Sequence, residues 1–74
     1  MVVAVPNRLR ELREQRGLTR MALALRLNPP TTERTVARWE ALDVAIPDER
    51  KVELARLFRV AVGELIDWDG LDRP

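Results

Sequence analysis

The chain has 74 residues, and its 13 basic and 12 acidic side chains give a formal net charge of +1. A chain of this length is expected to form a single domain, because domains most often contain about 100–150 residues. The absence of cysteine and histidine excludes a disulfide framework, a zinc finger and any catalytic site that uses either residue as nucleophile or base. The 46% hydrophobic and 34% charged content is typical of a small folded helical domain.

No stretch approaches the ~18 apolar residues of a transmembrane helix, so no membrane contact is expected. The apolar opening, residues 1–5, ends at Pro6 and lacks the positively charged start of a signal peptide. We therefore expect a cytoplasmic protein. Its domain is predicted over residues 7–67, after an N-terminal extension (1–6) and before a C-terminal tail (68–74).

The first two predicted helices are separated by a glycine. A helix is predicted over residues 8–15, with Asn7 as its N-cap and Gly17 as its C-terminal stop. Thr19 then caps a second helix that ends near Leu27.

A third helix follows a proline turn. The run Asn28-Pro29-Pro30 must end the second helix, because a residue before proline is pushed out of the α region. Thr31 or Thr32 then caps a helix over about residues 33–41, and Trp39 on its apolar side is expected to be buried.

Two more helices are predicted after a loop over residues 42–46. One starts at Pro47 and runs through residue 58, and a short last helix covers residues 62–67. The fourth helix offers four apolar residues to the core: Val52, Leu54, Ala55 and Phe58. The sequence thus predicts an all-α fold of five short helices.

Charge is unevenly distributed along the chain. Residues 1–39 carry eight arginines and three glutamates (8 − 3 = +5), whereas residues 40–74 carry five basic and nine acidic residues (5 − 9 = −4). A basic half joined to an acidic half indicates a polyanion bound on one side only. Chance segregation on a solvated surface is the alternative explanation.

Several segments resemble, in order and spacing, the phage-repressor-like (Cro-type, lambda repressor-like) helix-turn-helix family. They are residues 7–19 (Asn-Arg-Leu-Arg-Glu-Leu-Arg-Glu-Gln-Arg-Gly-Leu-Thr), Leu23-Ala24-x-x-Leu27, Thr35-Val-Ala-Arg-Trp-Glu40, Leu54-Ala55-x-x-Phe58-x-Val60 and Glu64-Leu65-Ile66. The resemblance implies a five-helix domain whose third helix, residues 32–41, enters the major groove of double-stranded DNA.

The sequence departs from the family pattern in three places. The turn with Pro29-Pro30 is two residues longer than usual, and Ala41-Leu42 replaces the glycine that normally follows Trp-Glu. The loop over residues 43–46 is apolar and acidic where relatives often place basic phosphate contacts. These departures predict a lower DNA affinity and leave the half-site geometry open.

The resemblance assigns DNA contacts residue by residue. Base contacts are expected from Thr32, Glu33, Arg34, Ala37 and Arg38, and phosphate contacts from Thr19 and Arg20. Arg34 would bind guanine O6 and N7, and Glu33 would accept from cytosine N4. Without the resemblance, Arg34 and Arg38 are better explained as solvated charges. Given the resemblance, contact with DNA becomes the better explanation for both residues.

The family also pairs an arginine of the first helix with a glutamate, which implies an ion pair between Arg13 and Glu40. Two apolar groups have no place in this scheme. Met21 and Leu25 form the first group. They could pack against residues 2–5 or against the proline turn, or they could form an exposed patch for a partner protein. Leu42, Val44, Ile46 and Trp68 form the second group, which a homodimer could bury.

Enzyme function is not expected, because the sequence contains no glycine-rich phosphate loop and no nucleophile–base pair. Glu49 and Glu53 are interpreted as a solvated helix surface, and no metal or cofactor is expected. The sequence predicts a sequence-specific DNA-binding transcriptional regulator of bacterial or phage type that acts as a dimer. The alternatives are a protein–protein interaction module on a helix-turn-helix scaffold that has lost DNA binding, or a fragment of a longer regulator.

Overall fold

The computed structural model describes residues 7–66, so the expectations for residues 1–6, for Trp68 and for the tail lie outside the described residues. The described part is all-helical, which confirms the predicted fold class. Its helices are α1 (Leu9–Gln15), α2 (Arg20–Arg26), α3 (Glu33–Glu40), α4 (Asp48–Phe58) and α5 (Val62–Leu65).

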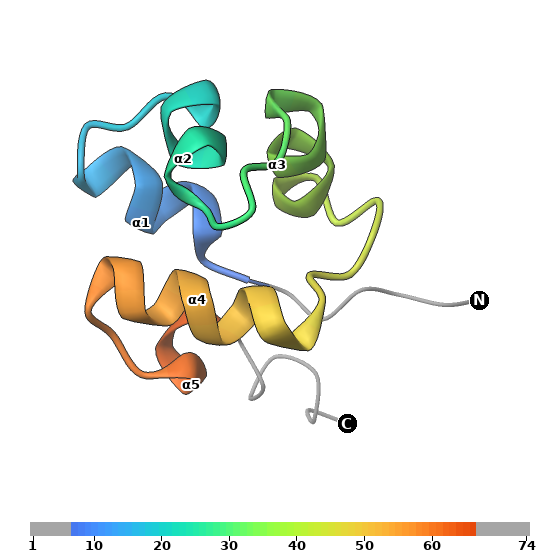
Figure 1. Ribbon diagram of the computed structural model, residues 1–74. Coiled ribbons are helices and arrows are strands. Elements are labelled where there is room, and N and C mark those ends of the chain that lie inside the picture. The colour runs from blue at the N-terminus through green and yellow to red at the C-terminus, as the bar shows by residue number, and fades with distance from the viewer. Residues whose placement is uncertain (1–6, 67–74) are drawn as a thin grey trace.

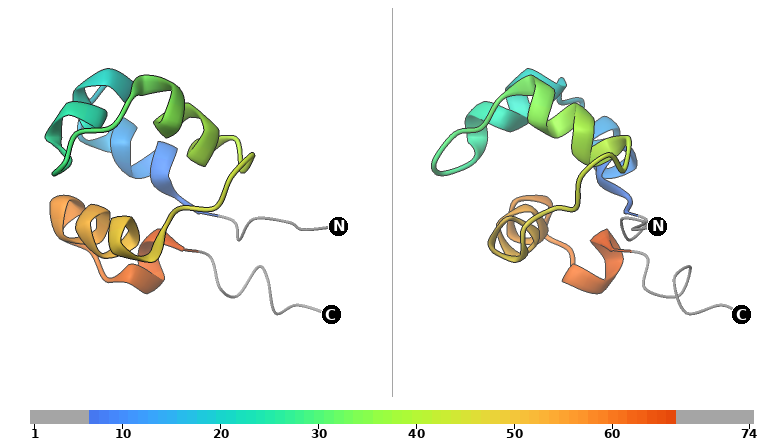
Figure 2. Two further views of the ribbon diagram at one scale, coloured as in Figure 1. Left: turned by 45° about the vertical axis from the view of Figure 1, so that its right-hand side comes forward. Right: turned by 90° about the vertical axis from the view of Figure 1, so that its right-hand side faces the viewer.

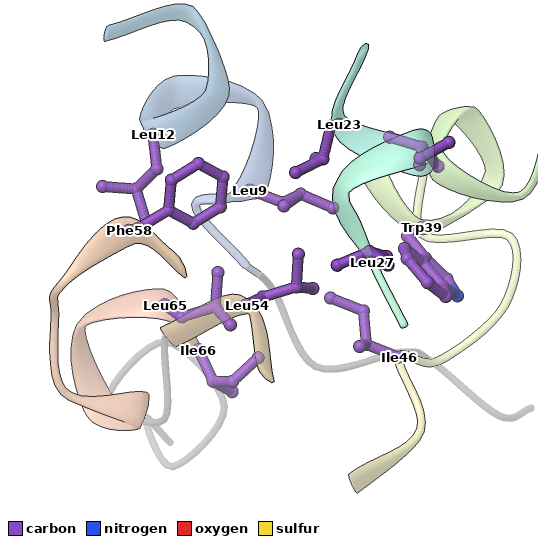
Figure 3. Packing of buried hydrophobic residues seen from close by; sticks show 12 residues of the cluster. Leu9, Leu12, Leu23, Leu27, Trp39, Ile46, Leu54, Phe58, Leu65 and Ile66 are labelled. Carbon is purple, nitrogen blue, oxygen red and sulfur yellow. The ribbon is translucent and has the colours of Figure 1, made fainter. Parts of the chain in front are cut away.

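The helices form two groups around one core. Helices α2 and α3 lie together at one side of the molecule with α1 next to them, and α4 and α5 lie at the opposite side (Figures 1 and 2). The buried cluster contains Leu9, Leu12, Leu23, Ala24, Leu27, Val36, Trp39, Ile46, Leu54, Phe58, Leu65 and Ile66. Figure 3 shows that all five helices and the loop before α4 contribute to it. Such short helices depend on this shared burial, because isolated helices below about 12–15 residues are marginal in water.

Asn7 ties the start of α1 to the rest of the domain. Its Oδ1 accepts the backbone N–H of Leu9 (3.0 Å), and its Nδ2 donates to the carbonyl of Trp39 at the end of α3 (3.1 Å). The helix begins at Leu9 and its N-cap is Arg8, so both lie one residue later than predicted. Arg8 donates its backbone N–H to the carbonyl of Leu65 (2.8 Å). Asn7 precedes the N-cap, and its side chain binds both the first residue of α1 and the end of α3.

Threonine caps define the starts of α2 and α3. The Thr19 hydroxyl accepts the N–H of Ala22 (3.0 Å), and the Thr32 hydroxyl accepts the N–H of Thr35 (3.1 Å). Thr32, and not Thr31, is therefore the cap of α3. This bond places the first turn of α3 directly after the proline turn.

Three expectations need correction. Val52 is 44% exposed, because the core side of α4 holds Leu54 and Phe58, both fully buried. Ile46 is buried at 5% exposure and belongs to the core of the single chain. The last helix ends at Leu65, because Ile66 forms an isolated antiparallel bridge with Asn7. Trp39 is buried as predicted, with 3% of its surface exposed.

Two residues other than glycine adopt a left-handed backbone. Leu42 has φ 62°, at the position where the expected glycine is missing after α3, and Arg59 has φ 57° at the end of α4. Gly17, at φ 66°, ends α1 as predicted. The left-handed region costs an L-residue about 1–2 kcal/mol, because its Cβ crowds the following carbonyl oxygen.

Replacing Arg59 by glycine should relieve this strain. We expect Arg59→Gly to raise the free energy of unfolding by about 0.5–1 kcal/mol relative to Arg59→Ala, because only glycine lacks the crowded Cβ. Both variants remove the guanidinium, so their difference isolates the backbone effect. Urea denaturation measures it, and equal stability of the two variants would contradict a strained position.

Candidate nucleic-acid interface

The outer side of α3 brings the predicted base-contacting residues together. Thr32, Glu33, Arg34 and Arg38 are exposed, and Ala37 is half-buried. Within residues 7–66, no hydrogen bond or ion pair involves the side chains of Glu33, Arg34 or Arg38. The polar groups of these three side chains are therefore available to a ligand.

The two predicted phosphate contacts lie at the start of α2, and both have a partner inside the domain. The Thr19 hydroxyl oxygen accepts the N–H of Ala22 as the helix cap, which leaves its O–H as a donor. Nε of Arg20 donates to Oε1 of Glu40 at 3.0 Å, and the Arg20 side chain remains 40% exposed. This contact with Glu40 was missed from the sequence, because it joins residues 20 positions apart.

The predicted partners Arg13 and Glu40 lie together below this surface. Arg13 Nε is 2.6 Å from Glu40 Oε2, and the two side chains are only 10% and 3% exposed. Arg13 Nη1 also donates to the Leu18 carbonyl (2.7 Å). The hydrogen bond to Glu40 raises the pKa of the Arg13 guanidinium, although burial acts in the opposite direction. Through Arg13 and Arg20, the Glu40 carboxylate joins α1, α2 and α3.

The outward charge of the α2–α3 pair is positive because Glu40 is sequestered. The pair's arginines are Arg20, Arg26, Arg34 and Arg38, and its exposed carboxylate is Glu33.

The domain that contains this two-helix unit matches a known family, since the family model described as helix-turn-helix covers residues 9–65. The chain belongs to the phage-repressor-like (Cro-type) helix-turn-helix family. It is a family of DNA-binding regulators that are generally not enzymes.

No significant match to this helix-turn-helix chain is found among curated proteins or among solved structures. Within residues 7–66, no helix is long and apolar enough to cross a membrane. The same part of the chain contains no group of three or more acidic side chains that could hold a metal ion.

The proline turn between α2 and α3 is held by α4. Arg50 Nη2 donates to the Pro29 carbonyl (2.7 Å), and Glu53 Oε2 accepts the backbone N–H of Asn28 (2.6 Å). Arg50 and Glu53 also form an ion pair with each other, with Nη1–Oε1 at 2.7 Å. We call these two residues the α4 clasp. Interpreting Glu53 as mere solvated surface was therefore wrong, because its partner is 25 residues away and invisible to local spacing.

Arg16 is a further basic residue with a structural role. Its Nη2 donates to the carbonyl of Phe58 at the end of α4. This bond satisfies a carbonyl that the helix itself leaves unpaired. Part of the arginine excess of the first half thus stabilises the fold.

Met21 and Leu25 remain exposed, at 55% and 64%. The proline turn therefore does not cover them. Cover by residues 2–5 lies outside the described residues, and a surface patch for a partner stays a prediction. In the loop after α3, Leu42 is 36% exposed and Val44 is half-buried, while Ile46 belongs to the core.

The Arg13–Glu40 pair should be strongly coupled. Replacing Glu40 by glutamine should lower the free energy of unfolding by about 3–5 kcal/mol, because it leaves the Arg13 guanidinium buried without its carboxylate. Arg13→Gln should cost less, since Glu40 keeps its ion pair with Arg20. An exposed pair would contribute only about 0–1 kcal/mol. Urea denaturation of both single variants and the double variant gives the coupling energy, and a value below about 1 kcal/mol would contradict a sequestered pair.

Glu53 should make stability depend on pH. Burial alone would raise its pKa, but the Asn28 N–H and Arg50 together lower it below the ordinary 4.5. A carboxylate whose pKa is lower in the folded than in the unfolded state stabilises the fold, and this contribution is complete at any pH above the unfolded-state pKa. The contribution is lost as the pH falls through the folded-state pKa. The stability advantage of the wild type over Glu53→Gln should therefore shrink below pH 4.5. Thermal unfolding between pH 7 and pH 2.5 checks this, and a constant difference would contradict it.

Proposed function

We propose that this chain is a sequence-specific DNA-binding transcriptional regulator of bacterial or phage type, with α3 as its recognition helix. The observation that supports this most directly is the outer side of α3. Arg34 and Arg38 are exposed there without a partner among residues 7–66, beside the arginines of α2. Charged side chains that the fold does not use, on the helix that this family places in the major groove, suit DNA readout.

Base readout is proposed for the first turn of α3. Arg34 would donate to guanine O6 and N7, and Glu33 would accept from the amino group of cytosine. Thr32 and Ala37 would lie close to the base edges, where the small side chain of Ala37 lets the backbone approach. Arg38, one turn later, would bind a phosphate or a base edge.

Phosphate binding is proposed for Arg20 and Thr19 at the start of α2. The Arg20 bond to Glu40 uses Nε, which leaves the Nη groups as donors to a phosphate oxygen. Because Glu40 holds the guanidinium from below, less side-chain entropy is lost when the phosphate binds. Arg20 would thereby set the register of α3 without reading sequence.

A homodimer is proposed because one recognition helix contacts too few bases for strong discrimination. Two copies on a palindromic site would double the base contacts. Half-sites of this kind lie about one helical turn apart.

Arg34 and Arg20 should contribute to binding in different ways. Arg34→Ala should cost about 1–3 kcal/mol on the cognate duplex and relax the preference at one base pair per half-site. Arg20→Ala should weaken binding to all duplexes alike and reduce the salt slope by about 1 per bound subunit. A cognate site is first selected from random duplexes, and affinities for it and for a scrambled duplex are then measured at several salt concentrations.

Arg56→Ala is the matched control, because it removes one exposed arginine from α4, a helix outside the α2–α3 pair. It should leave the ratio of cognate to scrambled affinity unchanged. If the wild type shows no salt-dependent DNA binding even at low ionic strength, the DNA proposal fails. A folded scaffold that binds a protein partner would then be the better interpretation.

A further inference from the structure

The link between α2 and α3 is held in part by hydrogen bonds from α4. Residues 27–32 connect the two helices. Leu27 is buried, the N–H groups of Leu27 and Thr31 donate to the Ala24 carbonyl (3.4 and 3.1 Å), and Thr32 caps α3. Between these anchors, Asn28 and Pro29 are held from α4, where Glu53 accepts from Asn28 and Arg50 donates to the Pro29 carbonyl. The α4 clasp therefore fixes the backbone that precedes the recognition helix.

The side chains of the α4 clasp are themselves held in place, so they can restrict the motion of the turn before α3. Its two side chains are only 17% and 27% exposed, and their ion pair keeps each in the rotamer that meets the turn. Each hydrogen bond from the clasp to the turn has one ionised partner, which makes it stronger than a bond between neutral groups. The lowered pKa of Glu53 agrees with a carboxylate that is held in its charged form.

The far end of the same link carries the first groups proposed to touch DNA. Thr32 caps α3 through the Thr35 N–H, and Arg34 lies in the first turn that follows. Base readout requires donors to be held to within a fraction of an ångström of the base edge. Without the clasp, residues 28–30 would have no hydrogen bond to the rest of the described chain, and this freedom would let the first turn of α3 move relative to α2 and its phosphate contact.

We propose that Glu53 and Arg50 are positioning residues for DNA readout: the α4 clasp holds the proline turn so that the first turn of α3 meets the base edges. This inference rests on the proposed DNA-binding function and deepens it. Neither residue touches DNA in this arrangement. Their effect is on discrimination between sequences and not on general affinity.

The experiment compares Glu53→Ala with Glu49→Ala, which removes an exposed carboxylate from the same helix. Both variants change the net charge equally, and circular dichroism confirms that each is folded at the temperature of the assay. Glu53→Ala should lower affinity for the selected cognate duplex about tenfold, equivalent to the loss of one good base contact, relative to Glu49→Ala. Affinity for a scrambled duplex should be the same in both variants.

Two further variants separate positioning from general damage. Glu53→Gln keeps an oxygen that can accept from Asn28, so it should recover part of the cognate affinity. In an Arg34→Ala background, Glu53→Ala should cost less than in the wild type, because the contact that it misplaces is already gone. Equal losses on cognate and scrambled duplexes, or full additivity with Arg34→Ala, would overturn the proposal.

A measurement without DNA tests the same link independently. Amide hydrogen exchange at Thr35, whose N–H is held by Thr32, should be faster in Glu53→Ala than in Glu49→Ala. If the wild type binds DNA and neither exchange nor discrimination differs between the variants, the clasp proposal alone fails. If the wild type binds no DNA, the proposed function fails and the readout role fails with it, whatever the exchange shows.

Discussion

The shared carboxylate of Glu40 is the interaction on which the helix-turn-helix unit depends. It lies almost fully buried between the guanidinium groups of Arg13 and Arg20, which come from two other helices. Taking a carboxylate out of water costs several kcal/mol unless charged hydrogen-bond partners replace the solvent. Here both oxygens have such partners, and no buried side-chain polar atom of the described residues lacks one. One carboxylate thus orients three short helices.

The same arrangement decides which charges face outward. Glu40 would otherwise place a negative charge on the helix that carries Arg34 and Arg38. Because it is buried and neutralised from within, the outer side of α2 and α3 keeps its arginine excess. The electrostatics of the candidate interface and the stability of the fold therefore have a common physical origin.

Helix α4 supports the unit from the other side of the core. Its apolar residues Leu54 and Phe58 pack in the central cluster, its last carbonyl accepts from Arg16, and its clasp reaches the proline turn. The turn with Pro29 and Pro30 is thus held by polar contacts from a distant segment. Such contacts offset part of the conformational entropy that is lost when the link is ordered.

Local chemistry in the sequence was sufficient to determine the five helices, most of their ends and the buried tryptophan. Threonine caps, Gly17 and the proline run act within a few residues of themselves, so they can be recognised without a fold. Apart from the Arg13–Glu40 pair, which the family resemblance implied, the contacts between residues 20 or more positions apart were decided only by the tertiary structure. Glu53 on Asn28, Arg16 on Phe58 and Glu40 on Arg20 are examples. The sequence shows that a side chain is charged, but its partner depends on how helices pack, and packing places a side chain by distance in space and not along the chain.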